Sequence, residues 1–315
     1  MSLIVPGNSA SARPPQPAPD RCVVLRDGRR IAIAEFGTPA GTPVLYFHGF
    51  PASRLEAQLV HRAAVDQRVR ILALDRPGFG CSDFQPRTLA QCPDDVVEVA
   101  DALHVERFAV LGVSGGAPFT LACAAALGSR ISALAIIAGL GMTSVTEDLA
   151  RFDVIARWSF QLARSAPALS RTVNRALGVV LRWRPELLDT LLGAGDSPPD
   201  REVLADPQIA AALAAASREA LRAGSEGASH ELGLLARPWD FDVASIRVPC
   251  HLWHGERDCT VPIEMTRRLA ALIPGCGATF LADEGHFSLP VRHAERVLRT
   301  LLQHAQSAPH RPASN

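Results

Sequence analysis

The chain of 315 residues is 48% hydrophobic and carries 32 basic and 32 acidic side chains, so its formal net charge is zero. That balance gives no overall attraction to nucleic acid or to an anionic membrane, and neither is expected as a partner. The length suffices for one large core, or for a core with an inserted subdomain.

Both ends of the chain have the composition of disordered tails. Residues 1–20 and 307–315 are rich in Pro, Ala and Ser. The N-terminus lacks the basic start and the long apolar run of a signal peptide. No stretch approaches the roughly 20 uncharged apolar residues that a bilayer span needs. Seven scattered cysteines without a CxxC pair argue against a disulfide framework. We therefore expect a cytoplasmic protein, and the sequence predicts no oligomeric state.

Residues 21–37 begin the predicted core with two β-type runs around Asp27-Gly28, a pair suited to a tight hairpin turn. Beyond them, short aliphatic runs predict strands buried on both faces, at 43–49, 70–75, 108–113, 131–138, 249–255 and 278–285. Amphipathic segments between these runs predict helices at 53–66, 94–105, 116–127, 264–273 and 291–305. The alternation predicts an α/β fold with a mostly parallel central sheet and helices on both faces.

One long interval, residues 141–245, interrupts this alternation. It contains no convincing strand, only helical stretches such as 151–165 and 207–223 that are separated by Pro and Gly. About a hundred residues is too long for a loop in a compact domain. We therefore expect an inserted helical cap that divides the core into residues 21–140 and 246–306.

A serine stands at the break between the run at 108–113 and the next helical segment. The sequence GVSGG (112–116) matches GxSxG, and it lies after a strand and before a helix as a nucleophile elbow requires. The sharp turn strains the serine backbone and leaves little room nearby, hence the glycines. Ser114 is the predicted nucleophile. A flexible Gly–Ser turn is the alternative, whereas a dinucleotide site fits poorly because the GxGxxG spacing is missing.

A serine hydroxyl needs a base to remove its proton. His286 lies just after the last predicted strand, in a glycine-flanked loop before the last helix, and it is the predicted base. Other histidines lie within helical patterns among charged neighbours, where solvated structural roles are expected: His61, His104, His293 and His304.

A carboxylate must orient that base. Asp258 follows the strand predicted at 249–255 and precedes the apolar pair Val261-Pro262, which favours it for this role. The order Ser, Asp, His along the chain is the order expected for this architecture. The alternatives are Glu256, Asp240, Asp242 and Asp283.

Acyl transfer also requires donors for a developing oxyanion. The backbone N–H groups of Gly115 and Phe50 are the predicted donors, because Phe50 lies in a turn between a strand and a helix. His48 is expected to support that turn by hydrogen bonding. His251 and His254 fall on opposite faces of a strand, so no metal site is expected. The predicted substrate-binding side chains are Phe50, Phe79, Phe119, Trp158 and Phe287.

Five motifs in this order resemble those of the α/β-hydrolase superfamily, over about residues 22–305. They are HGFP (48–51), DRPGFGCS (75–82), GVSGG (112–116), HGERDCTVP (254–262) and DEGHF (283–287). The first two look most like the cap-bearing branch that includes epoxide hydrolases, haloalkane dehalogenases, esterases and proline iminopeptidases. The resemblance implies a cofactor-free mechanism. Gly115 departs from many relatives, which carry a larger residue there, and its small size widens the floor of the pocket.

The nucleophile divides the chemistry of that branch, since epoxide hydrolases and dehalogenases use an aspartate where this chain has Ser114. We therefore expect a serine hydrolase that cleaves a carboxylic ester, lactone or thioester of a small to medium apolar substrate. One alternative is a carbon–carbon bond hydrolase. Another is a proline-type aminopeptidase, which needs cap acids for a substrate ammonium; the candidates are Glu147, Asp148, Asp153, Glu226 and Glu231. A third is a ligand-binding protein with little turnover.

Overall fold

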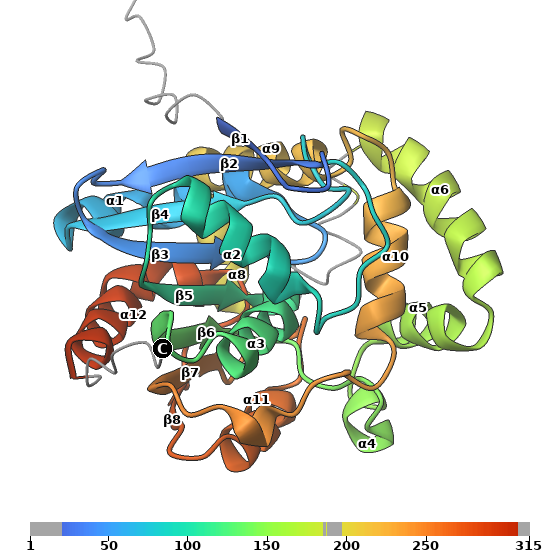
Figure 1. Ribbon diagram of the computed structural model, residues 1–315. Helices are drawn as coiled ribbons and strands as arrows, with labels where there is room; N and C mark the ends of the chain where they lie inside the picture. The colour runs from blue at the N-terminus through green and yellow to red at the C-terminus, as the bar shows by residue number, and fades with distance from the viewer. Residues whose placement is uncertain (1–20, 185–186, 188–196, 308–315) are drawn as a thin grey trace, which may run out of the picture.

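Eight strands form one sheet in the order β1-β2-β4-β3-β5-β6-β7-β8 in the computed structural model (Figure 1). The structure describes residues 21–184, 187 and 197–307. The strands are β1 Arg21–Val24, β2 Arg30–Gly37, β3 Thr42–Phe47, β4 Val69–Leu74, β5 Phe108–Val113, β6 Ile131–Ile137, β7 Cys250–Gly255 and β8 Gly277–Leu281. The predicted tails lie outside the described residues, except for Ser307 at the end of the last helix.

The sheet is antiparallel only at its first edge. β1 pairs with β2 and β2 with β4 in antiparallel register, and every later pair is parallel. The predicted hairpin and mostly parallel sheet are therefore confirmed. The final predicted strand is too long, because β8 ends at Leu281 and residues 282–285 (Ala-Asp-Glu-Gly) turn away instead. That turn supplies the loop that carries His286.

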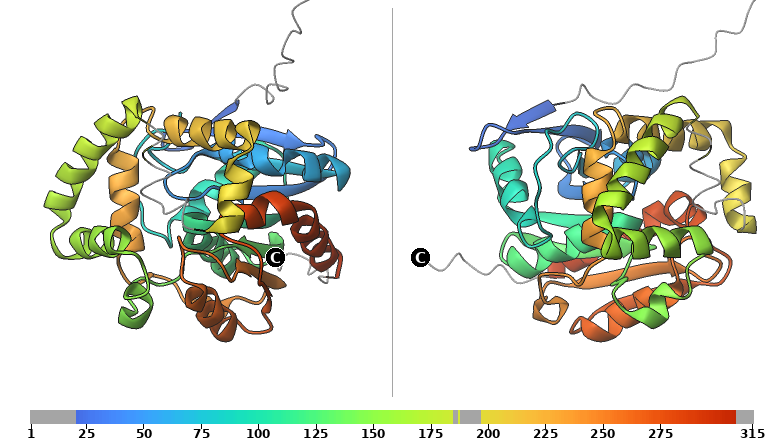
Figure 2. Two further views of the ribbon diagram at one scale, coloured as in Figure 1. Left: turned by 180° about the vertical axis from the view of Figure 1, so that it is seen from behind. Right: turned by 90° about the vertical axis from the view of Figure 1, so that its right-hand side faces the viewer.

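Helices cover both faces of the sheet (Figures 1 and 2). α1 (His61–Asp66) and α12 (Ser288–Ser307) pack on one face, and α2 (Cys92–Ala102), α3 (Ala117–Ala126) and α11 (Ile263–Leu272) lie on the other. Alternate residues of β3 feed the two cores: Val44 and Tyr46 face the first layer, and Leu45 and Phe47 the second. The helix predicted at 53–66 begins as a 3-10 helix, η1 (Arg54–Val60), before it continues as α1.

Between β6 and β7 the described residues form helices and no strand. They are α4 (Thr146–Leu149), α5 (Val154–Ser165), α6 (Pro167–Trp183), α8 (Pro198–Leu204), α9 (Pro207–Ala220), α10 (Glu226–Leu235) and the short η3 (Val243–Ser245). We call residues 141–245 the helical segment. Its helices α5, α6 and α10 lie beyond the carboxyl ends of the parallel strands (Figure 1). No described helix is long and apolar enough to cross a bilayer.

Candidate active site

Ser114 follows β5 without an intervening residue and begins the 3-10 turn η2 (Ser114–Gly116). Its φ is +50°, in the left-handed region that side chains other than glycine rarely adopt. The Ser114 carbonyl accepts a hydrogen bond from the Leu140 N–H at 3.0 Å, which fixes the turn against the loop after β6. This is the strained strand-to-helix geometry that exposes a nucleophile at the end of a sheet.

The glycines after Ser114 are required by close packing against the loop that follows β3. A Cβ atom on Gly115 would lie 2.5 Å from Phe50 Cβ, and one on Gly116 would lie 2.2 Å from the Phe47 carbonyl oxygen. Neither contact is tolerated without a backbone shift. The two segments predicted to supply oxyanion donors are therefore in direct contact.

Asp258 and His286 come from the loops after β7 and β8, which end at the same edge of the sheet as β5. His286 Nδ1 lies 2.7 Å from Asp258 Oδ2, and both side chains are buried. Asp258 Oδ1 accepts hydrogen bonds from the N–H groups of Thr260 and Val261, each at 2.8 Å. The carboxylate thus has a fixed orientation toward the imidazole.

Mutual attraction outweighs burial for this pair. Burial alone would raise the pKa of Asp258, but the charge of His286 and the hydrogen bonds from His254 and His286 lower that pKa well below its usual range. Burial alone would lower the pKa of His286, but the charge and hydrogen bond of Asp258 raise it above the usual value near 6.5. The charge of Asp258 therefore stabilises the protonated form of the His286 ring.

His254, at the end of β7, supports the same carboxylate. Its Nε2 atom lies 3.3 Å from Asp258 Oδ2 and 3.0 Å from the Val261 carbonyl oxygen. Its Nδ1 atom lies 2.7 Å from Thr266 Oγ1. A fully buried ring therefore braces the Asp258 loop, a role that the sequence does not predict.

Asp200, at the start of α8, holds the backbone of the histidine loop. One of its oxygens accepts a hydrogen bond from the His286 N–H at 2.9 Å, and the other accepts from the N–H groups of Phe287 and Ser288 at 2.9 and 2.8 Å. A Cβ atom on Gly285 would lie 2.4 Å from this carboxylate. Asp200 thus caps the start of α12 from within the helical segment, and it is 1% exposed.

Arg76 joins the Phe50 loop to the helical segment. Its guanidinium donates to the carbonyl oxygens of His48 and Gly49, and it forms a two-pronged pair with Glu231 of α10 at 2.7 and 2.6 Å. His48 is fully buried, with Nδ1 2.8 Å from the Gly49 carbonyl oxygen. Burial, together with the charge of Arg76, lowers the pKa of His48 well below its usual value. These contacts set the direction of the Phe50 N–H.

A second buried carboxyl group, Glu56 of η1, supports the same turn. Its Oε2 atom accepts hydrogen bonds from the Gly49 N–H at 2.8 Å and from the Tyr46 hydroxyl at 2.9 Å. Burial raises the pKa of Glu56 above its usual range. Glu56 lines a small cavity together with Ser114 and His286, so an ionisable group beyond the predicted three faces the site.

Two cavities meet at Ser114. The smaller, of about 50 Å³, is lined by Ser114 and His286. The larger, of about 190 Å³, extends from Ser114 and Gly115 under α5, α6 and α10. Its wall is mostly apolar and includes Leu140, Phe152, Phe160, Leu181, Leu232 and Val261. Such a wall suits the apolar part of a small or medium ligand.

Of the five side chains predicted to bind substrate, Phe50 and Phe287 face these cavities. Phe50 lines both, and Phe287 lines the smaller one. Phe50 carries the predicted oxyanion donor itself, and Phe287 follows the predicted base His286 directly.

The other three lie elsewhere. Phe79 and Phe119 are buried behind the Phe50 loop, where the Arg76 guanidinium lies 5.3 and 4.7 Å from their ring centroids. Trp158 is 64% exposed on the outer side of α5, whereas Ile155 lines the larger cavity. None of the three lines either cavity at Ser114, because helix periodicity and ring packing turn them away.

Metal-binding arrangements are not found among the described residues, which hold no cluster of three His, Cys, Asp or Glu side chains suited to an ion. His251 contacts Thr279 on β8 and His304 on α12, while His254 faces Asp258. All seven cysteines are free thiols.

Comparisons with known proteins agree with this fold. A family model described as the alpha/beta hydrolase fold matches residues 42–292. A thermophilic esterase from Thermogutta terrifontis is similar in structure (TM-score 0.64, 20% identity, 92% of this chain and 100% of that one), as is the enol-lactonase from Burkholderia xenovorans (TM-score 0.64, 19% identity, 91% and 100%). At these identities the likeness shows the fold alone.

A curated sequence relative is the dihydrolipoyllysine-residue acetyltransferase component of the acetoin cleaving system from Pseudomonas putida. It is 31% identical over 128 residues, which are 40% of this chain and 34% of the relative. The chain therefore matches about a third of that relative's length. The family model spans most of the chain, and the elbow, the sheet order and the loop positions described above are those that its fold requires. The chain belongs to the α/β-hydrolase fold family.

Proposed function

We propose that the protein is a serine hydrolase that cleaves a carboxylic ester, or a lactone or thioester, of a small to medium apolar substrate. The observation that carries the proposal is the buried Asp258–His286 pair, whose imidazole lines the same cavity as the strained Ser114. A base, an orienting carboxylate and a hydroxyl in one cavity are the parts that nucleophilic acyl transfer needs.

In the proposed reaction, Ser114 Oγ attacks the acyl carbon while His286 Nε2 takes the hydroxyl proton. The N–H groups of Phe50 and Gly115 hold the oxygen of the tetrahedral intermediate. Its collapse breaks the bond to the leaving alcohol or thiol, which receives the proton from His286. A water molecule, deprotonated by His286, then attacks the acyl-enzyme and releases the acid and free Ser114.

The apolar wall of the larger cavity supports the proposal that the acyl or alcohol group of the substrate is apolar. The aminopeptidase alternative is less well supported. Five acids were candidates to hold a substrate ammonium, and only Asp153 among them lines that cavity. Its carboxylate already accepts from the Ile155 and Ala156 N–H groups at 2.7 and 2.9 Å, as the cap of α5. Glu231 forms a buried ion pair with Arg76, so its charge is already balanced within the protein. Carbon–carbon bond hydrolysis stays an alternative for the same three residues.

The test is the hydrolysis of p-nitrophenyl acetate and butyrate by the wild type and by Ser114→Ala. We expect the variant to lose at least about a thousandfold in kcat/KM, because nothing else supplies the nucleophile. The matched control is Ser159→Ala, which removes another hydroxyl from the wall of the larger cavity. A Ser114→Ala rate near that of the wild type contradicts the proposal.

A second measurement separates the alternatives. Labelling of Ser114 by a fluorophosphonate, without sustained ester turnover, would indicate a ligand-binding protein with little activity. Faster cleavage of a proline nitroanilide, or of a 1,3-diketone, than of every ester and lactone tested would favour the amide or the carbon–carbon alternative.

A further inference from the structure

Helices α5 and α6 present an exposed apolar face. Twelve large hydrophobic side chains are exposed in the described part of the chain, and eight of them lie on these two helices. The eight are Val154, Ile155, Trp158, Leu169, Val173, Leu177, Val179 and Val180. Exposed apolar side chains gathered in this way mark an interaction surface, whereas single scattered ones do not.

The spacing places most of these side chains in stripes. On α6, Leu169, Val173, Leu177 and Val180 follow one another by four, four and three residues, so they lie along one side of the helix. On α5, Val154 and Trp158 are four residues apart. The two helices are adjacent in sequence and pack against each other.

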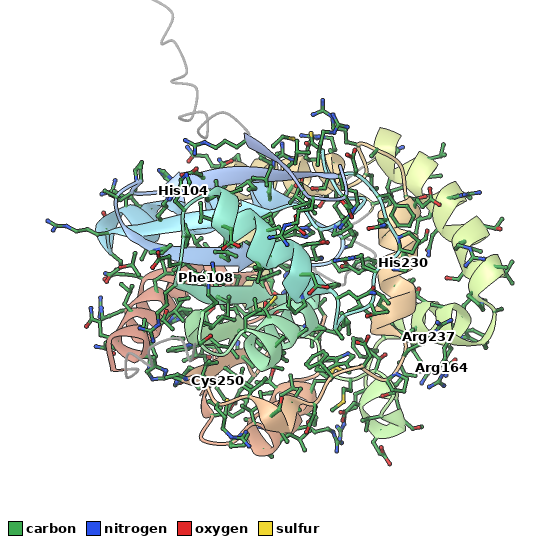
Figure 3. All side chains as sticks on the ribbon, in the orientation of Figure 1. His104, Phe108, Arg164, His230, Arg237 and Cys250 are labelled. Atoms are coloured by element: carbon green, nitrogen blue, oxygen red, sulfur yellow. The ribbon has the colours of Figure 1, made fainter. Side chains whose placement is uncertain are left out.

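The same two helices hold a concentration of positive charge. Residues 154–184 include six arginines and no acidic residue, although the whole chain is neutral. Within the described part of the chain, no ion pair involves Arg157, Arg164, Arg171 or Arg175. Figure 3 shows Arg164 at the outer side of the molecule, at the end of α5. These charges are available to an external partner.

On α6, Arg171 and Arg175 are two residues away from members of the stripe, so they lie across the helix from it. Helices with an apolar side that includes a Trp, and with arginines on their polar side, are typical of the interface of an anionic membrane. A second copy of the chain is a poorer partner. A two-fold interface brings the same stretch together from both copies, so it would bring two basic stretches near each other with no acidic residue of either stretch to pair with the arginines. Charge complementarity therefore selects lipid.

We propose that the outer face of α5 and α6 is a docking surface for a membrane that contains anionic phospholipids. The apolar stripes enter the headgroup boundary and the arginines contact lipid phosphates. Ile155 and Leu177 belong to this face and also line the larger cavity. Docking therefore brings the opening of that cavity to the lipid. Docking itself does not depend on the proposed hydrolysis.

The test is flotation of the full chain with vesicles of phosphatidylcholine alone or with one third phosphatidylglycerol. We expect binding to the mixed vesicles, at least tenfold weaker binding to phosphatidylcholine, and release as salt is raised, because screening shortens the range of the charges. Equal binding to both vesicles, or none to the anionic ones, overturns the proposal.

Variants locate the surface. The double variant Arg171→Glu/Arg175→Glu is expected to bind anionic vesicles at least twentyfold less tightly, since each charge near the surface contributes about fivefold. The control Arg62→Glu/Arg218→Glu makes the same change in net charge on α1 and α9 and should bind as the wild type does. Equal losses in both double variants would contradict a local surface.

Trp158→Ser tests the apolar part against Val24→Ser, another exposed hydrophobic residue on the distant β1 edge. Only Trp158→Ser should weaken vesicle binding, and thermal unfolding checks that both variants are folded. Light scattering measures the oligomeric state and so tests the alternative that this face binds a second copy of the chain. A wild-type dimer that Trp158→Ser converts to a monomer, without vesicle binding by either form, would assign this face to self-association and overturn the proposal.

Discussion

At the scale of single residues, His286 is held from two sides by carboxylates far apart in sequence. Asp258 contacts the ring at Nδ1, and Asp200 contacts the backbone N–H of the same residue. Asp258 orients the imidazole. Asp200 fixes the loop that carries it, and its charge adds to the rise in the pKa of His286.

Asp200→Asn should shift the pH dependence of hydrolysis. The loss of a negative charge lowers the pKa of His286, so the acid limb of kcat/KM should move to lower pH. An Asn nitrogen cannot accept the His286 N–H, so we also expect a loss of about 1–3 kcal/mol of stability. Profiles of kcat/KM between pH 5 and 9 and thermal unfolding measure the two effects.

The control for this variant is Glu202→Gln on the same helix, where the carboxylate is exposed and pairs with Arg292. Its acid limb should coincide with that of the wild type. An unchanged limb in Asp200→Asn would reduce Asp200 to a purely structural cap.

Gly115→Ala tests the close contact between the elbow and the Phe50 loop. A Cβ atom there lies 2.5 Å from Phe50 Cβ, so the two proposed oxyanion donors must separate. We expect kcat to fall about tenfold to a thousandfold with little change in KM, as for the loss of an oxyanion donor. Gly128→Ala is the control, because a Cβ atom at that position meets nothing within 4 Å. Full activity in Gly115→Ala would argue against this oxyanion site.

The sequence alone predicted candidate site residues that lie after strands. It did not predict residues such as Asp200 and Glu56, whose contacts with the site form only in the folded chain. Ser114 and His286 stand directly after predicted strands, and Asp258 stands three residues after one; parallel strands bring their ends to one edge. Asp200 lies in a helix 86 residues from its partner, and no local pattern links the two. Glu56 follows a recognised motif, but only burial reveals its contact with Gly49.

At the scale of elements, the helical segment is attached to the core by apolar packing, in which Leu149, Phe160 and Leu232 belong to the same cluster as the core, and by buried carboxylates. Besides Asp200, three acids of this segment pair with core arginines: Glu231 with Arg76, Glu219 with Arg54, and Asp148 with Arg268. Arg76 lies in the motif DRPGFGCS, and Arg54 begins η1, just after the motif HGFP. The segment therefore helps to shape the loops that it covers.

Glu231→Gln should destabilise the fold and slow catalysis together. It leaves the buried Arg76 without its charge partner, a change that costs about 3–5 kcal/mol in comparable pairs. Because Arg76 also holds the His48 and Gly49 carbonyl groups, we expect kcat to fall as well. Denaturant unfolding and ester kinetics report both effects.

Glu226→Gln, an exposed acid in the first turn of the same helix, is the control and should change neither. Wild-type stability in Glu231→Gln would mean that the pair contributes no net free energy.

The prediction of secondary structure was most accurate for the sheet, because strands that are buried on both faces have uninterrupted aliphatic sequences. Six such runs correspond to β3 to β8, with an error at the end of β8. The direction in which side chains of the helical segment point was less predictable. Aromatic content suggested Trp158 as a pocket residue, but helix rotation places it outside, and only three-dimensional packing decides that.

At the scale of the whole molecule, average charge concealed an uneven distribution. The neutral total argued against a membrane partner, yet the arginines of α5 and α6 are unmatched within their own stretch. The acids that balance them lie elsewhere, many in the contacts between segments. The mean charge of the chain therefore does not describe the charge of each of its surfaces.

The raised pKa of His286 also predicts how stability varies with pH. A group whose pKa is higher in the folded than in the unfolded state stabilises the fold below its unfolded pKa, and this contribution is lost as pH rises through the folded pKa. We therefore expect Tm to fall as pH rises above about 6.5, the ordinary pKa of histidine. His286→Gln should flatten that fall, as differential scanning calorimetry can measure. An equal slope in both proteins would contradict the assignment.

The contact of Asp200 with the histidine loop has a consequence for engineering. Exchanging residues 141–245 for the corresponding segment of a relative is an obvious way to change specificity. Such a chimera would also remove the acceptor for three backbone amides at the start of α12. A graft that keeps native α8 and replaces only α5 and α6 would alter the wall of the larger cavity and leave the loop of His286 in its native position.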